Sequence, residues 1–173
     1  MPWIGPGEPE DAIAMALSPE LADHPVLRRL QAFHPEAVVE ASDFRGQLAV
    51  VLRSDLVRPV LEFLKDDSAL RFNFLADLTA VDRYPVEPRF EIVYQLRAME
   101  SGQRLRIKAR VAGDDPRIDS VVSLWPVADM LEREVFDLFG VRFTGHPNLR
   151  RLLMPDDWEG FPLRKDYPVE GPR

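Results

Sequence analysis

The residues best suited to chemistry lie in one short stretch, where Glu132, Arg133, Glu134 and Asp137 fall within six consecutive positions. Paired carboxylates can act as general acid and base, and His146 adds a third titratable group nearby in the sequence. On a helix, however, positions 132 and 134 point to different faces. A free-standing acid/base enzyme built on Glu132, Asp137 and His146 is therefore a remote alternative, and it predicts a concave pocket lined by those groups.

No set of side chains in the sequence suits a metal or a cofactor. The three histidines, His24, His34 and His146, are far apart, whereas a metal site needs several converging ligands. The chain has no cysteine, which excludes disulfides and iron–sulfur ligation by its own residues. It also has no Gly-rich dinucleotide or Walker-type phosphate loop. We therefore expect no catalytic, cofactor-binding or metal-binding residue in this chain.

A helix is expected from Pro126 to Phe139, with Gly140 as its C-terminal stop. At about 100° per residue, its apolar residues form one stripe, namely Val127, Met130, Leu131, Val135 and Leu138. Glu134 falls within that stripe, and an unpaired charge is costly to bury. We therefore expect Glu134 to be buried in an ion pair with Arg150 or Arg151.

The opposite face of this helix carries Asp129, Glu132, Arg133, Phe136 and Asp137. Charges of opposite sign four residues apart are typical of a solvated, salt-bridged face. Phe136 does not fit that interpretation, because it would be an exposed aromatic beside charges. An aromatic residue next to arginine is typical of an interface, so this face favours contact with a partner.

Residues 140–173 contain five prolines and four glycines, so long helices or strands are not expected there. The segment is too apolar to be disordered, since it includes Leu149, Leu152, Leu153, Trp158 and Phe161. Composition alone leaves open whether it packs on its own domain or on a partner. We expect a docking arm with Trp158 as an apolar anchor and with basic residues that meet partner carboxylates: Arg150, Arg151, Arg164 and Lys165.

The elements that position these residues follow from the hydrophobic pattern. Helical pieces are expected after Ser18 and after Asp23, a hairpin over residues 38–52, and a helix over residues 55–65 with Pro59 in its first turn. Three strands follow, at residues 72–81, 90–96 and 105–111. The order α-β-β-α-β-β-β-α predicts a two-layer α+β fold with a mixed, largely antiparallel sheet. We assign residues 1–139 to one domain, with an irregular lead or short helix in 1–17, and residues 140–173 to the arm.

Composition bounds the class of protein. The chain has 173 residues, 46% of them apolar and 29% charged, as in an ordinary globular domain. Its net charge of −7 argues against nucleic-acid binding, which needs Lys and Arg to neutralise phosphates. The sequence lacks the roughly 18 consecutive apolar residues of a membrane span, and its first residues do not read as a secretory signal. Any membrane association is therefore expected to go through partners.

Three motifs follow one another in the second half of the chain, from Leu131 to Phe143, from Gly145 to Leu153 and from Gly160 to Pro168, the last including Arg164, Lys165 and Asp166. Together they resemble the 30-kDa-type subunit of respiratory complex I, the C component of NADH:quinone oxidoreductase. Residues 74–82 and 119–126 also look like that family, so the similarity covers roughly residues 70–168. Asn148 and Phe161 depart from the pattern, since the family usually has Asp and His there.

The resemblance implies a non-catalytic structural or assembly subunit of the peripheral arm, on the cytoplasmic side of the bacterial plasma membrane. Its implied partners are the hydrophilic-arm subunits D, B and I, of which D carries the quinone site and B and I carry iron–sulfur clusters. The whole complex uses FMN, iron–sulfur clusters, NADH and quinone and pumps protons, whereas this subunit is implied to bind none of those cofactors. The equivalent subunit of a membrane-bound hydrogenase or related quinone-linked dehydrogenase remains the alternative, because it shares the motif.

Overall fold

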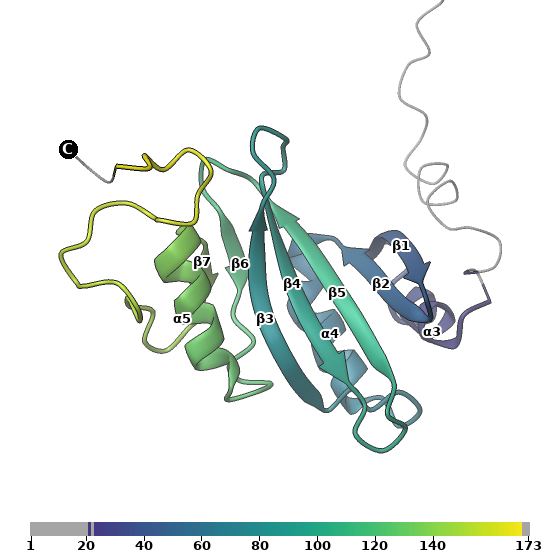
Figure 1. Cartoon of the computed structure of the whole chain (residues 1–173). Coiled ribbons are helices and arrows are strands. Elements are labelled where there is room, and N and C mark those ends of the chain that lie inside the picture. The colour runs from purple at the N-terminus through teal and green to yellow at the C-terminus, as the bar shows by residue number, and fades with distance from the viewer. Residues whose placement is uncertain (1–20, 22, 171–173) are drawn as a thin grey trace, which may run out of the picture.

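The computed structural model describes residue 21 and residues 23–170, and its centre is a five-stranded sheet with the strand order β1-β2-β5-β4-β3 (Figure 1). The strands are β1 (Val38–Phe44), β2 (Gln47–Leu52), β3 (Phe74–Asp82), β4 (Phe90–Arg97) and β5 (Arg104–Val111). Neighbouring strands are antiparallel, except for the parallel pair β2 and β5. A parallel pair needs a crossover, and the intervening helix, β3 and β4 provide it. The predicted mixed, largely antiparallel α+β fold is thus confirmed.

Two helices lie on one side of this sheet. Helix α3 (Pro25–Phe33) lies beside β1 and β2, and α4 (Val57–Asp66), preceded by the 3₁₀ turn η1 (Ser54–Leu56), lies behind β4 and β5 in Figure 1. The N-cap of α3 is His24, one residue after the predicted Asp23, and its Nδ1 accepts the amide of Val26. Pro59 occupies the first turn of α4, as predicted. The helical piece expected after Ser18 lies outside the described residues.

Apolar and basic side chains alternate along β5, and the apolar ones contribute to the core. Leu105, Ile107, Ala109 and Val111 are buried, while the basic residues between them are half-buried. The buried side meets α4, which contributes Val57, Val60, Leu61 and Leu64. One face of the sheet is therefore covered by helices and the other is open, which agrees with the predicted two-layer arrangement.

Helix α5 (Ala128–Phe139) packs against β3 and ends at Gly140, whose φ of 76° gives the left-handed C-cap. The predicted phase of its buried stripe is wrong in part, although Val135 is buried and Leu131 and Leu138 pack against the core as expected. Val127 and Met130 are each 51% exposed and Glu134 is exposed, whereas Glu132 and Asp137 are fully buried. The physical reason is that hydrogen bonds from segments distant in the sequence satisfy these two carboxylates, a compensation that the apolar pattern of a single helix does not record.

Two short strands were not predicted. Strands β6 (Arg117–Asp119) and β7 (Arg142–Thr144) form a parallel pair in which Ile118 lies opposite Phe143, and both of these side chains are buried. A run of three residues carries too little periodicity to be recognised. The pair matters for the site because it joins the segments that precede and follow α5. Among the described residues, no helix is both long and apolar enough to cross a membrane.

Candidate functional site

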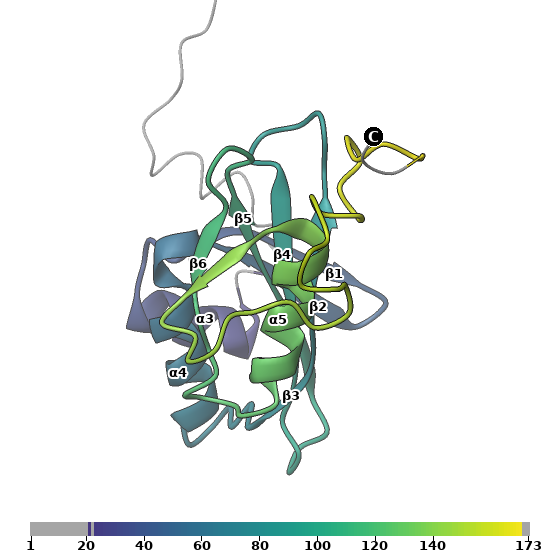
Figure 2. The ribbon, with the colours of Figure 1, turned by 90° about the vertical axis from the view of Figure 1, so that its left-hand side faces the viewer.

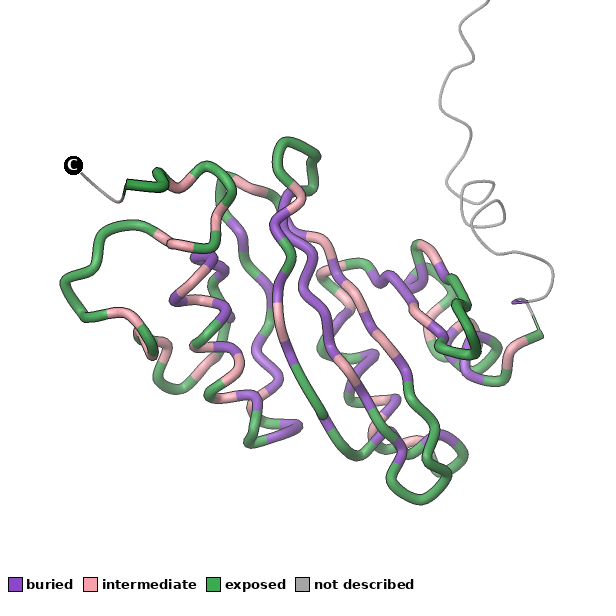
Figure 3. The backbone as a smooth tube through the Cα atoms, in the orientation of Figure 1, coloured by how far each residue is buried: buried purple, intermediate pink, exposed green. Residues whose placement is uncertain are grey.

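The residues after β7 form an irregular strap, defined as residues 145–170, which runs back across α5 (Figure 2). All its residues are half-buried or exposed (Figure 3). A segment without a core of its own must be fixed by particular contacts, and three anchors supply them. Composition left open whether this segment packs on its own domain, and these anchors show that much of it does.

The first anchor is the fully buried carboxylate of Asp137 on α5. Its Oδ2 accepts the backbone amides of Leu152, Leu153 and Met154 at 2.9, 2.7 and 2.8 Å. Its Oδ1 accepts Nη1 of Arg151 at 2.7 Å. Burial alone would raise the pKa of Asp137, but these donors outweigh burial and lower it below the ordinary value. The carboxylate is therefore charged, and it fixes the strap to the helix through backbone groups.

Two arginines complete the first anchor. Arg151 also donates to the carbonyls of Trp158 and Gly160, both at 2.9 Å, so one guanidinium holds two parts of the strap. Arg133 donates to the carbonyls of residues 150 and 151 at 3.2 and 3.0 Å. The expected ion pair of Glu134 with Arg150 or Arg151 is thus wrong, because the acid that Arg151 meets is Asp137.

The second anchor lies where α5 ends. Nε of Arg164 donates to the carbonyl of Phe139 at 2.6 Å, and its guanidinium lies over the rings of Phe90 and Phe161, 5.1 and 4.6 Å from their centres. Burial lowers the pKa of Arg164, and the neighbouring charge of Arg89 lowers it further. A Cβ on Gly140 would come within 2.6 Å of both Arg164 and Phe161. Two features therefore require glycine at position 140. One is the left-handed backbone of the helix cap, and the other is the close approach of the strap.

The third anchor joins the far end of the strap to the β3–β4 hairpin. Arg89 makes two hydrogen bonds to Asp82, at 2.9 and 2.8 Å, and two to Asp166, at 2.8 and 2.7 Å. Asp82 also accepts the amide of Lys165 at 2.8 Å. The hydrogen bond from Arg89 lowers the pKa of Asp82, and the two carboxylates together raise the pKa of Arg89. Lys165 and Asp166 were predicted as interface residues, whereas Asp82 and Arg89 were missed.

A signal for the missed pair exists in the sequence. Asp82 ends one strand and Arg89 precedes the next, so antiparallel pairing places the two side by side. Opposite charges at the two residues that flank an expected hairpin loop predict such a contact.

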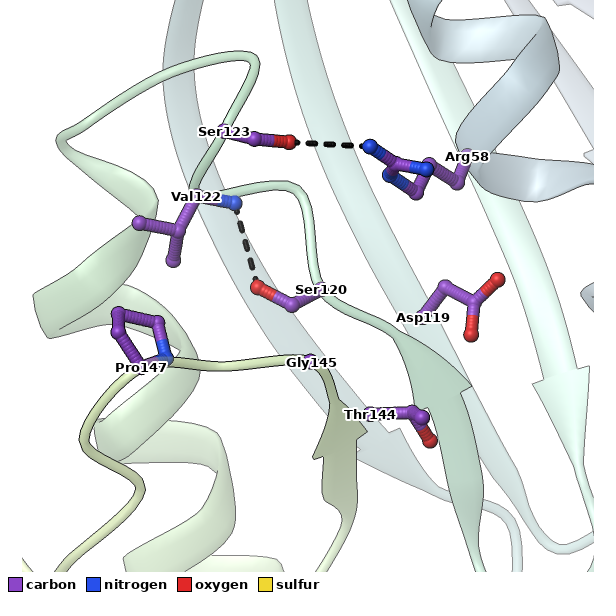
Figure 4. A pocket seen from close by; sticks show the side chains of 8 residues that line it. All are labelled: Arg58, Asp119, Ser120, Val122, Ser123, Thr144, Gly145 and Pro147. Carbon is purple, nitrogen blue, oxygen red and sulfur yellow. Dashed lines mark hydrogen bonds between the residues drawn. The ribbon is translucent and has the colours of Figure 1, made fainter.

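Glu132 lies apart from these anchors. Its carboxylate is fully buried and accepts the hydroxyl of Ser120 and the amide of Val121, each at 2.7 Å. Burial raises its pKa to about 7. Ser120 also lines a groove of about 470 Å³, together with Arg58, Asp119, Ser123 and Thr144 (Figure 4). Glu132 thus lies behind the wall of this groove.

The three residues of the acid/base alternative have separate partners. Glu132 binds the chain at residues 120–121, and Asp137 binds the strap. His146 accepts the amide of Asn148 on Nδ1, while its Nε2 lies 3.2 Å from both the carbonyl and the carboxylate of Asp129. No hydrogen bond or ion pair joins Glu132, Asp137 and His146 in the described part of the chain, so no observed contact supports a common catalytic site.

The outer side of the strap carries side chains that the anchors leave free. Leu153, Trp158 and Leu163 are 56%, 37% and 52% exposed. Within residues 21 and 23–170, the side chains of Arg150 and Lys165 have no ion-pair or hydrogen-bond partner, whereas Arg151 and Arg164 are committed to their own chain. Phe136 is half-buried against the ring of Phe161 rather than exposed beside charges.

Comparison with known proteins gives a consistent family. The model described as "Respiratory-chain NADH dehydrogenase, 30 Kd subunit" matches residues 50–173. The C subunit of an NADH-quinone oxidoreductase from Roseiflexus sp. (strain RS-1) is 49% identical over 144 residues, which cover 83% of each chain. The protein of the same name from Citrifermentans bemidjiense is 45% identical over 144 residues, covering 83% of this chain and 88% of the relative.

Two solved structures share sequence as well as fold. The trypsin-resistant fragment of Nqo5 superposes with a TM-score of 0.62 at 36% identity, covering 72% of this chain and 96% of that one. A chain of the membrane-bound sulfane sulfur reductase, an archaeal respiratory membrane complex, gives a TM-score of 0.69 at 29% identity, covering 83% and 84%.

Proposed function

Because the chain belongs to the family of 30-kDa subunits of respiratory-chain NADH dehydrogenase, we propose that it is a non-catalytic structural subunit in the peripheral arm of a proton-pumping NADH:quinone oxidoreductase. Its task is to hold neighbouring subunits in place while electrons pass from NADH through FMN and iron–sulfur centres to quinone. Those cofactors belong to other subunits in this proposal. The chain has no cysteine to ligate a cluster.

The observation that carries the proposal is the anchored strap. Three anchors fix its backbone, yet Leu153, Trp158 and Leu163 remain at least 37% exposed. Large apolar side chains on a pre-ordered frame are suited to an interface, because little conformational entropy is lost when a partner covers them. We propose that residues 140–173 act as the docking arm and that the partners are the quinone-site and iron–sulfur subunits D, B and I.

Location follows from the same proposal. The chain is peripheral, on the cytoplasmic side of the bacterial plasma membrane, and is held there by its partner subunits. Salt or a chaotrope should then release it from membranes, since polar interfaces weaken under both. Release by detergent alone would point instead to a direct lipid anchor.

A pull-down tests the proposal. The tagged full-length chain is purified from native membranes in mild detergent, and co-purifying subunits are identified by mass spectrometry. An NADH-binding flavoprotein subunit together with the quinone-site subunit is the expected result. Recovery of a nickel–iron hydrogenase subunit or of a sulfur reductase would assign the chain to a related complex. The similarity to the archaeal reductase is the reason to test for this alternative.

A second experiment tests the strap within the complex. Trp158→Ala with Leu163→Ala should lower quinone-linked NADH oxidation through poorer assembly, and should leave NADH oxidation by artificial acceptors at the flavin largely intact. Val39→Ala is the control, because Val39 is 39% exposed but lies on β1, at the opposite edge of the sheet from β3 and α5. Equal losses in both variants would contradict a specific role for the strap.

A further inference from the structure

The open face of the five-stranded sheet carries an unusual distribution of charge. In Figure 1, α4 lies behind the sheet, and no helix of the described residues lies in front of β4 and β5. Alternation places Arg97 of β4 on this face, together with Arg104, Arg106, Lys108 and Arg110 of β5. The whole chain has a net charge of −7, so this group of five basic residues on one face is opposite in sign to the charge of the chain as a whole.

One half of this face is internally neutralised. Glu91 meets Lys108 at 2.8 Å and Arg110 at 3.1 Å, and Glu40 of β1 meets Arg110 at 2.7 Å. The hydrogen bond from Arg110 lowers the pKa of Glu40, which keeps that carboxylate charged. A hollow of about 430 Å³ lies at this end, bordered by Glu40, Lys108 and Arg110. These charges stabilise the sheet itself.

The other half is not neutralised. We define the arginine patch as Arg97, Arg104 and Arg106, whose guanidinium groups make no ion pair or hydrogen bond with any of the residues that the structure describes. Arg97 lies directly opposite Arg104 in the β4–β5 register, and Arg106 follows two residues on, opposite Gln95. The nearest acid in register is Asp77 on β3, which lies opposite Gln95 on its other side.

Such an arrangement is unfavourable in the isolated chain. Like charges directly opposite each other destabilise an antiparallel pair. In addition, Nε of Arg106 is buried and has no hydrogen-bond partner among residues 21 and 23–170, so these residues do not compensate its lost contact with water. A carboxylate supplied from outside would remove both costs, because guanidinium groups bind carboxylates in a two-bond geometry.

We propose that the arginine patch is a docking surface for a carboxylate-rich segment of a neighbouring subunit. This inference rests on the proposed function, since it requires the chain to be part of an assembly. Phe74 of β3, which is 47% exposed, lies directly opposite Arg97 on this face, whereas Val81, also 47% exposed, lies opposite Glu91 in the neutralised half. Arginine beside exposed apolar residues is the composition of a protein interface. Three cations on an acidic chain are too few for a nucleic-acid surface.

Charge reversal tests the patch in the full complex. A tagged full-length chain carrying Arg97→Glu, Arg104→Glu and Arg106→Glu should be recovered with about tenfold less of its partner subunits, and moderate salt should reduce recovery of the wild-type complex in the same way. Arg142→Glu is the control, because Arg142 is exposed on β7 and its side chain has no ion-pair partner within residues 21 and 23–170. Undiminished recovery of the triple variant, or equal losses in variant and control, overturns the proposal.

Zero-length coupling identifies the occupant. Arg104→Lys keeps the charge and provides an amine that a carbodiimide joins to a carboxylate within contact distance. A cross-link from residue 104 to an acidic residue of another subunit supports the proposal. A cross-link to Glu8, Glu10 or Asp11 of the chain itself overturns it, as does binding to phosphatidylglycerol vesicles that the triple variant abolishes while no cross-link to another subunit forms.

Different results contradict the proposed function and the docking role of the arginine patch. If the wild-type chain co-purifies with no respiratory subunit, the proposed function itself is contradicted, and the patch then has no assembly to bind. If the wild-type complex is recovered but the triple variant assembles equally well, the function stands and only the docking surface is rejected.

Discussion

At the scale of single residues, Asp137 is the strongest anchor of the strap. Replacement by Ala removes the acceptor of three backbone amides and leaves Arg151 without its carboxylate. We expect Asp137→Ala to lower the free energy of unfolding by about 3 kcal/mol, the usual cost of breaking a buried ion pair from one side. Urea denaturation of the full-length chain measures it.

The control for this prediction is Glu134→Ala on the same helix. Glu134 is exposed, so its removal should change the free energy of unfolding by no more than about 0.5 kcal/mol. The apolar stripe of the helix predicted the opposite, with Glu134 as the buried acid. Equal destabilisation by both substitutions would show that the burial of Asp137 is not what stabilises the chain.

Glu132 should make stability depend on pH. Burial raises its pKa from 4.5 to about 7, so between these values the folded state holds a proton that the unfolded state has released. The unfolding free energy therefore falls as pH rises from 4.5 to 7, by at most about 3 kcal/mol. Glu132→Gln resembles the protonated form and should remove most of this slope, which denaturation at pH 5.5 and pH 8 would measure.

Other buried carboxylates do not obscure that slope. The pKa values of Asp82 and Asp137 are lowered below the ordinary 3.8, so the stability that these acids contribute is present above that pH and is lost only in stronger acid. If wild type and Glu132→Gln showed the same pH dependence between 5.5 and 8, Glu132 would not be protonated in the folded chain.

At the scale of elements, the junction of α5 and the strap depends on Gly140. Gly140→Ala adds a left-handed backbone cost of about 1 kcal/mol and a collision with Phe161 and Arg164. The second anchor should loosen, so proteolysis should cut near residues 160–167 faster. Gly46→Ala is the matched control, because Gly46 has the same φ of 76° and no atom of the described residues lies within 4 Å of an added Cβ.

The elements themselves could be predicted because their signals are local. Alternation in residues 105–111 marked β5, and the glycine at position 140 marked the end of α5. The phase of α5 could not be predicted in the same way. Its two buried acids are satisfied by residues 120–121 and 151–154, so their burial depends on tertiary contacts rather than on the helix.

The same limit applies to the site. An ion pair of Glu134 with Arg150 or Arg151 was expected, but the acid that Arg151 meets is Asp137, three positions further along the helix. Arg164 was expected to reach a partner, yet it is held by the carbonyl of Phe139 and two aromatic rings. Backbone carbonyls carry no sequence signature, so such contacts are visible only in the folded chain.

At the scale of the whole molecule, the chain is a sheet domain with a strap fixed along one side and an arginine patch on the open sheet face. The two surfaces lie on different parts of the molecule, the strap over α5 and the patch on β4 and β5 (Figures 1 and 2). A subunit with two separate docking surfaces can join two neighbours at once, which is the task proposed for it. The strap is the surface whose order can be measured directly before and after assembly.

Hydrogen exchange on residues 149–167 tests that order in the full-length chain, free and assembled. The amides of Leu152, Leu153 and Met154, which bind Asp137, and of Lys165, which binds Asp82, should be protected even in the free chain. The amide of Trp158 already donates to the carbonyl of Pro155 at 3.0 Å, but the other amides of residues 156–160 should gain protection only on assembly, because a partner excludes water there. Unchanged protection across 156–160 would mean that nothing docks on the strap. Free exchange at the four anchored amides in the isolated chain would mean that the anchors form only with the partner, since an intact hydrogen bond to a buried carboxylate must open before its amide exchanges.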